Sequence, residues 1–143
     1  MPVTPSALVE RFYHELWNKA DEGVAREILH PDLRFHASLG PEKRHPDGFI
    51  AYLRAVHAAL EDFTCTIDEL VATKDRAAAR MTFKGTHRAR FFGIEATGRA
   101  ITWAGGAFFR IEDNMIKDIW VLGDIDAVKR QLGAPVSAGF SAD

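Results

Sequence analysis

The fold is decided first by residues 4–18, which read TPSALVERFYHELWN. Thr4 followed by Pro5 is typical of a helix start, because Thr caps the first turn and proline needs no N–H there. The apolar side chains then recur in adjacent pairs, four residues apart: Leu8, Val9, Phe12, Tyr13, Leu16 and Trp17. This spacing predicts a helix of period 3.6 with one wide apolar face.

Two further helices are expected before any long strand. Asp21 is a candidate cap for the second helix, and Pro31 favours its end. Asp47 is expected to cap the third helix. Residues 31–46 lack a helical period, so they predict a loop with a short strand over residues 33–36.

The remainder of the chain changes to the alternating period of strands. Alternation predicts strands near residues 63–72, 77–87, 100–111 and 116–122. The third of these strands is apolar on both faces, so both of its faces are expected to be covered. A final short helix is expected after Asp124.

Helices followed by antiparallel strands indicate an α+β fold, with the helices on one face of a curved, mainly antiparallel sheet. A sheet curved around a long apolar helix leaves a conical interior. That interior is a ligand pocket unless side chains fill it. We expect one domain over residues 1–133 and a mobile C-terminal tail over residues 134–143.

Composition excludes several classes of protein. The 143 residues carry 18 Lys and Arg against 20 Asp and Glu, a formal net charge of −2, so a nucleic-acid partner is not expected. The 47% hydrophobic content excludes disorder, and the single Cys65 cannot form an internal disulfide. No apolar run reaches the roughly 18 residues of a membrane span, and the start does not resemble a signal peptide. A cytoplasmic protein without a membrane partner is therefore expected.

Five segments of the chain carry a more specific signal. They are ERFYHELWN (residues 10–18), HPDLRFH (30–36), FKGTHR (83–88), FGI with TGR (92–94 and 97–99), and IWVLGD leading to RQLG (119–124 and 130–133). In this order they resemble the SnoaL-like polyketide cyclase and ester cyclase family. The resemblance covers about residues 6–133.

The resemblance implies the cone-shaped barrel of nuclear transport factor 2 and ketosteroid isomerase. It also implies ring closure of a polyketide by intramolecular aldol condensation, with no metal or cofactor. One departure is GIEATG at residues 93–98, where the family usually has GIPPTG. The six histidines show no metal-ligand spacing, which agrees with the expectation that no metal site is present.

Three residues are candidates for catalysis. Asp124 matches the family's catalytic aspartate and would be the base; the alternative is a helix cap, whose backbone hydrogen bonds lower a carboxyl pKa and oppose base catalysis. His87 is predicted to point inward. There it would act as an acid or as a hydrogen-bond donor to an enolate oxygen; the alternative is a core histidine without a catalytic role. His36 is a candidate donor or an exposed loop residue.

Aromatic side chains are expected to form the wall of the pocket. The candidates for substrate contact are Tyr13, Trp17, Phe83, Trp103 and Trp120. For Tyr13 and Trp17 the alternative is a core position, whereas Trp103 and Trp120 offer flat surface for stacking on a cyclic ligand. Arg110 interrupts an apolar strand, and we expect it to pair with Asp118.

The leading hypothesis is a cyclase or isomerase-type lyase that uses Asp and His acid–base chemistry on a hydrophobic, polyketide-like carbonyl compound. The alternative is a non-catalytic homodimer of the same fold that binds a small hydrophobic molecule. Water attack on an epoxide ranks last. Pairing of two outer sheet faces is expected to form a homodimer, because one helical layer covers only one face.

Overall fold

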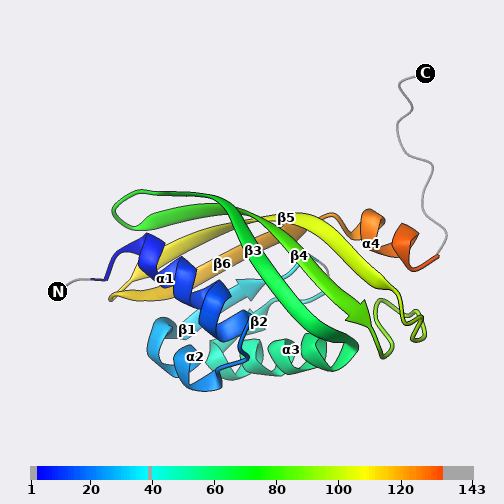
Figure 1. Cartoon of the computed structure of the whole chain (residues 1–143). Helices are drawn as coiled ribbons and strands as arrows, with labels where there is room; N and C mark the ends of the chain where they lie inside the picture. Colours follow the sequence, from blue (N-terminus) through cyan, green and yellow to red (C-terminus); the bar gives the residue numbers. More distant parts are fainter. Residues whose placement is uncertain (1–2, 39, 134–143) are drawn as a thin grey trace.

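A layer of helices packs against one face of a curved six-stranded sheet (Figure 1). The computed structural model describes residues 3–38 and 40–133. In chain order the elements are α1 (Pro5–Arg11), the π-helix η1 (Phe12–Trp17), α2 (Glu22–Ile28), β1 (Leu29–His36), β2 (Lys43–Arg44), α3 (His45–Ala59), β3 (Leu60–Ala72), β4 (Arg76–His87), β5 (Ala100–Glu112), β6 (Met115–Gly123) and α4 (Ile125–Gln131).

The first helix begins as predicted and then widens. The Thr4 hydroxyl accepts a hydrogen bond from the Ala7 N–H (3.1 Å). From Phe12 onward the helix has π geometry, so the expectation of an unbroken 3.6-residue period is wrong for its second half. After this segment, the Asn18 side chain reaches β3 and makes two hydrogen bonds to the Cys65 backbone (2.7 and 2.9 Å). The π-helical segment is therefore followed directly by a contact that joins the helix to β3.

The helices that follow differ from the prediction at their boundaries. Asp21 caps α2 through the Gly23 N–H (3.1 Å), as expected. β1 begins at once after α2, so the strand is longer than the predicted residues 33–36. α3 begins at His45, and Asp47 forms an ion pair with Arg26, so Asp47 is not the cap that the sequence predicted.

The sheet has the strand order β2-β1-β6-β5-β4-β3. β1 and β6 run parallel and the other neighbours run antiparallel, so the sheet is mixed but mainly antiparallel. The two edge strands β2 and β3 do not pair with each other, which leaves the curved sheet unclosed. The predicted α+β class and cone-type architecture are confirmed.

Alternation along β6 decides which residues face the helices. Ile119 is buried and Val121 lines the interior, whereas Trp120 and Leu122 are 46% and 58% exposed. Phe108 of β5 is 61% exposed on the same outer face, where its ring lies 6.0 Å from that of Trp120. The outer face is thus apolar and exposed, and the described residues of one chain do not provide the expected covering of β5 on both faces.

Three remaining expectations concern other parts of the chain. Arg110 donates to Asp118 (2.6 Å), which confirms the predicted pair. Within residues 3–38 and 40–133, no helix has the length and apolar character needed to cross a membrane. The predicted tail, residues 134–143, lies outside the described residues.

Candidate functional site

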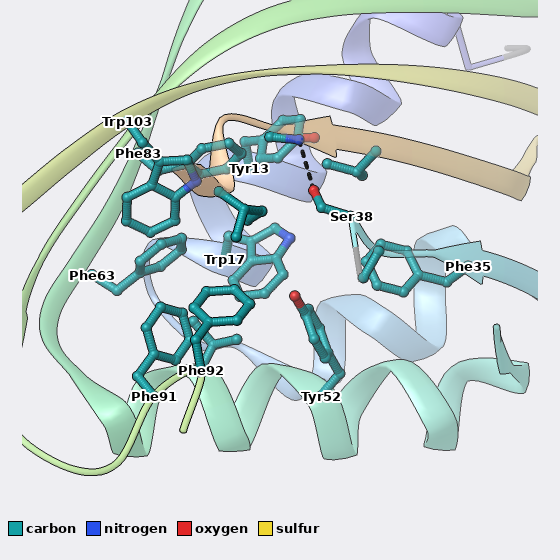
Figure 2. A pocket seen from close by; sticks show the side chains of 15 residues that line it. Tyr13, Trp17, Phe35, Ser38, Tyr52, Phe63, Phe83, Phe91, Phe92 and Trp103 are labelled. Atoms are coloured by element: carbon teal, nitrogen blue, oxygen red, sulfur yellow. Dashed lines mark hydrogen bonds between the residues drawn. The ribbon is translucent and has the colours of Figure 1, made fainter. Parts of the chain in front are cut away.

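A cavity of about 170 Å³ lies between the helices and the inner face of the sheet (Figure 2). An engineered apolar cavity of about 150 Å³ holds benzene, so this pocket has room for about one six-membered ring. Its walls come from η1, the end of β1, α3, the inner faces of four strands, the segment between β4 and β5, and the start of α4. The lining residues are Tyr13, Trp17, Phe35, Ala37, Ser38, Tyr52, Val56, Phe63, Phe83, Phe91, Phe92, Trp103, Val121, Gly123 and Ile125.

Stacked aromatic rings form the sheet side of the pocket. Phe83 and Trp103 are register partners on β4 and β5, and their ring centroids lie 5.2 Å apart with an interplanar angle of 27°. Phe63 of β3 continues the stack, 6.0 Å from Phe83. Gly105 makes this possible, because a Cβ there would lie 2.5 Å from the Phe83 ring. The wall therefore presents flat apolar surface to a ligand.

Tyr13 brings a hydroxyl group to the pocket from η1. The residue is 1% exposed, and its hydroxyl has no hydrogen-bond partner among the described residues. Burial raises the pKa of this phenol well above its ordinary value, so the group stays protonated. A buried hydroxyl without a partner costs folding free energy, which points to a ligand atom as its partner.

A second hydroxyl group, that of Ser38, lies beside the end of β6. The Ser38 hydroxyl accepts a hydrogen bond from the Gly123 N–H (2.7 Å), the contact drawn in Figure 2. A Cβ on Gly123 would lie 3.3 Å from the Trp103 indole nitrogen, so the glycine lets the strand approach both neighbours. The Tyr52 hydroxyl points from α3 toward the pocket (Figure 2), and burial raises its pKa.

The pocket contains neutral polar groups only. Among the lining residues that the structure describes there is no Asp, Glu, His, Lys or Arg. A bare charge would be unstable against such apolar walls, whereas hydroxyl and indole groups can donate to an uncharged oxygen. The arrangement suits a neutral aromatic molecule that carries carbonyl or hydroxyl oxygen.

The predicted base, Asp124, lies outside this pocket. Its side chain is exposed and accepts a hydrogen bond from the Ala127 N–H (3.0 Å) as the N-cap of α4. The reason is the alternation of β6: Asp124 has the same parity as Trp120 and Leu122, which face outward. The surroundings of Asp124 therefore match the helix-cap alternative.

The two candidate histidines lie apart from the pocket as well. His36 is on the outer face, 47% exposed in its side chain, and its Nε2 lies 3.0 Å from a Glu42 oxygen. His87 points inward as predicted and is fully buried, but it is not a lining residue; its Nδ1 contacts Thr97. The structure does not bring Asp124, His87 and His36 together.

Four of the five aromatic residues expected at the wall lie there: Tyr13, Trp17, Phe83 and Trp103. The fifth, Trp120, is on the outer face, so its expected place in the pocket is corrected by the same strand alternation. Sequence reasoning missed Phe91, Phe92, Tyr52 and Ser38 as lining residues. The spacing of Tyr52 from Phe49 and Val56 is a helical signal that could have found it, but the loop residues offered no periodic pattern.

One cluster of possible metal ligands, His30, Glu112 and Asp113, lies near the β5–β6 turn. The Asp32 N–H donates to Nδ1 of His30 (3.0 Å), which places the ring proton on Nε2. Nε2 then donates to Asp113 (3.1 Å). The histidine therefore serves as a hydrogen-bond donor that ties β1 to the turn.

Burial of Cys65 predicts a loss of stability at alkaline pH. Desolvation, with a smaller effect of Asp68, raises the pKa of this thiol, so the folded state holds the proton more tightly than the unfolded state. The free energy of unfolding should fall as pH rises above about 8.5, the ordinary thiol value. Urea unfolding at pH 7.5 and 10 should show a smaller fall for Cys65→Ala than for the wild type; equal falls would contradict this account.

Comparison with known proteins places the chain in a family. The family model of the SnoaL-like polyketide cyclases matches residues 7–132. TsrD from Streptomyces laurentii is 33% identical, with a TM-score of 0.82 over 91% of this chain and 95% of that one. IdmH from Streptomyces antibioticus, a candidate polyketide cyclase, is 28% identical, with a TM-score of 0.79 over 92% of this chain and 100% of that one.

The fold is shared more widely than the sequence. A candidate SnoaL-like polyketide cyclase from Jannaschia sp. CCS1 is only 17% identical, yet its TM-score is 0.83 over 95% of this chain and 99% of that one. The chain matches no curated protein sequence. The family match over nearly the whole chain, together with the shared fold, shows that this chain belongs to the SnoaL-like polyketide cyclase family.

Proposed function

We propose that the protein is a cyclase or isomerase that binds a neutral aromatic carbonyl compound in the pocket. The Tyr13 hydroxyl donates a hydrogen bond to the substrate oxygen on which negative charge develops. The observation that carries this proposal is the buried Tyr13 hydroxyl, which has no hydrogen-bond partner within residues 3–38 and 40–133. Family membership supports a cyclase or isomerase kind of function.

The proposed reaction is an intramolecular aldol closure. A proton leaves the carbon beside one carbonyl, the resulting enolate carbon bonds to a second carbonyl carbon, and the electron pair of that C=O moves to oxygen. The alkoxide then takes up a proton. Tyr13 stabilises this oxyanion because its hydroxyl, kept neutral by burial, donates in a site of low dielectric.

The apolar wall favours a particular substrate class. Since the described lining residues offer no carboxylate or imidazole, the proton must leave to water at the pocket mouth. Carbon between two carbonyl groups is acidic enough for this. The proposed substrates are therefore aromatic 1,3-dicarbonyl compounds whose ring occupies the stack of Phe63, Phe83 and Trp103.

One test uses 1-(2-formylphenyl)pentane-2,4-dione, which closes to 3-acetyl-2-naphthol with loss of water. The protein should accelerate naphthol formation, followed by absorbance, above the rate in buffer with an equal concentration of serum albumin. Binding of the dione without any acceleration would overturn the catalytic proposal.

That outcome would support the second candidate function, binding of a small hydrophobic molecule without catalysis. The neutral lining of the pocket is the observation that favours it, because a binding protein needs shape and hydrogen-bond donors but no base. The rate measurement thus separates the two functions.

The competing assignment, Asp124 as the base, is tested by two substitutions. Asp124→Asn keeps a capping oxygen for the Ala127 N–H. Turnover should therefore stay within a factor of about two of wild type, and the free energy of unfolding should change little. Asp124→Ala should lower the free energy of unfolding by about 1 kcal/mol. Loss of turnover by orders of magnitude in Asp124→Asn would instead identify the carboxylate as the base.

We also propose that two chains pair through their outer sheet faces. Phe108, Trp120 and Leu122 are exposed there in one chain, and contiguous apolar surface of this kind is typical of an interface. Sedimentation at micromolar concentration should show a dimer, and Phe108→Glu should shift it toward the monomer. A monomeric wild type would contradict the proposal.

A further inference from the structure

The segment between β4 and β5, residues 88–99, forms one end of the pocket and is called here the pocket loop. Phe91 and Phe92 line the cavity from this loop, with ring centroids 4.4 Å apart (Figure 2). Neither ring belongs to a helix or long strand. The shape of this end of the pocket therefore depends on what holds the loop.

The tip of the pocket loop has an unfavourable backbone conformation. Phe91 and Ile94 exchange two backbone hydrogen bonds of 3.0 Å across a tight turn. The two residues between them have positive φ: 51° at Phe92 and 76° at Gly93. Glycine adopts this conformation freely, but a bulky residue rarely does, so contacts elsewhere must stabilise the loop.

His87, the last residue of β4, supplies side-chain contacts at the base of the loop, where backbone hydrogen bonds also join Arg88 and Ala89 to Ala59. The Thr97 N–H donates to its Nδ1 (3.1 Å), and the Thr97 hydroxyl lies 3.0 Å from the same atom. The imidazole centroid also lies 6.4 Å from that of Phe91. One buried ring thus contacts the returning arm of the loop at Thr97 and faces the outgoing arm at Phe91.

The hydrogen bonds of His87 also indicate its tautomer. Because Nδ1 accepts the Thr97 N–H, the neutral ring carries its proton on Nε2. Nε2 is buried and has no partner among the described residues, and His87 does not line the cavity. The ring therefore has no free basic nitrogen to offer a ligand.

We infer that His87 is a positioning residue: through Nδ1 it fixes Thr97, and thereby holds Phe91 and Phe92 in place as the end wall of the pocket. This role is independent of the reaction proposed above. It needs an acceptor at the Nδ1 position, and it does not need an acid, a base or a positive charge.

Two substitutions separate the ring nitrogens. In His87→Asn the amide oxygen can occupy the place of Nδ1, whereas the longer side chain of His87→Gln carries its amide at the place of Nε2. Amide hydrogen exchange of residues 90–96 is measured in the ligand-free protein, with residues 106–110 of β5 as the internal reference. We expect exchange in the loop to be about tenfold faster in His87→Gln and close to wild type in His87→Asn.

Binding of acetophenone supplies a second readout. Its dissociation constant should rise about tenfold in His87→Gln and little in His87→Asn. If His87→Gln fails to fold, Thr97→Val removes the hydroxyl contact with Nδ1, together with the hydrogen bond that the Arg99 N–H donates to the same oxygen (3.2 Å), and should still speed loop exchange about threefold. The inference would be overturned if the two His87 variants had equal effects, or if His87→Asn had the larger effect. It would also be overturned if loop exchange were unchanged in a folded His87→Gln or in Thr97→Val.

Discussion

Tyr13→Phe should reduce the rate of dione cyclisation by about 10²–10³-fold, the usual effect of removing one donor to a developing oxyanion. The same substitution should raise the free energy of unfolding by about 1 kcal/mol, because it removes a buried hydroxyl that has no partner in the part of the chain that the structure describes. A gain in stability joined to a loss of turnover is typical of a functional group. The two quantities are measured by urea unfolding and by naphthol formation.

Tyr52→Phe is the matched comparison for this prediction. The Tyr52 side chain is less deeply buried than Tyr13, so its removal should change both quantities less. If Tyr13→Phe keeps its turnover, or loses stability as a packing residue would, Tyr13 has no part in catalysis.

Gly105→Ala should weaken acetophenone binding by at least tenfold. The new Cβ would lie 2.5 Å from the Phe83 ring, which must then move into the cavity or away from Trp103. Overpacking of this kind costs about 1–3 kcal/mol, so the melting temperature should also fall. Binding is measured by quenching of tryptophan fluorescence, and stability by thermal unfolding.

The neighbouring Gly106 provides the control. A Cβ there meets only the Ala79 carbonyl oxygen, at 3.7 Å, an ordinary contact. Gly106→Ala should therefore leave acetophenone affinity and melting temperature unchanged. Equal losses in the two variants would show that the strand, and not the Phe83 ring, responds to the substitution.

The sequence predicted the order and type of most elements, because periodicity is a local property. The Thr4 cap and the inward alternation of β4 were both correct. The π geometry from Phe12 was missed, because the apolar spacing fits a 3.6-residue period and the widened turn ends on a distant contact between Asn18 and Cys65. β1 was predicted too short, since its parallel pairing with β6 joins segments far apart in the chain.

The site was only partly predictable. Residues on regular elements, such as Trp17 and Phe83, could be placed at the wall from their periodicity. Asp124 could not be placed in this way. Its parity shows that it lies on the same face of the sheet as Trp120, but it does not show which face the helices cover. Phe91 and Phe92 were missed because the conformation of their loop depends on the His87–Thr97 contact, which no local pattern reveals.

The infrared carbonyl stretch of bound acetophenone, labelled with ¹³C at the carbonyl, tests the proposed role of Tyr13 most directly. A hydrogen bond from the Tyr13 hydroxyl should lower the stretching frequency in the wild-type complex relative to that in an apolar solvent. In Tyr13→Phe the band should return toward the apolar value while the ketone stays bound. An identical band in the two complexes would contradict the account.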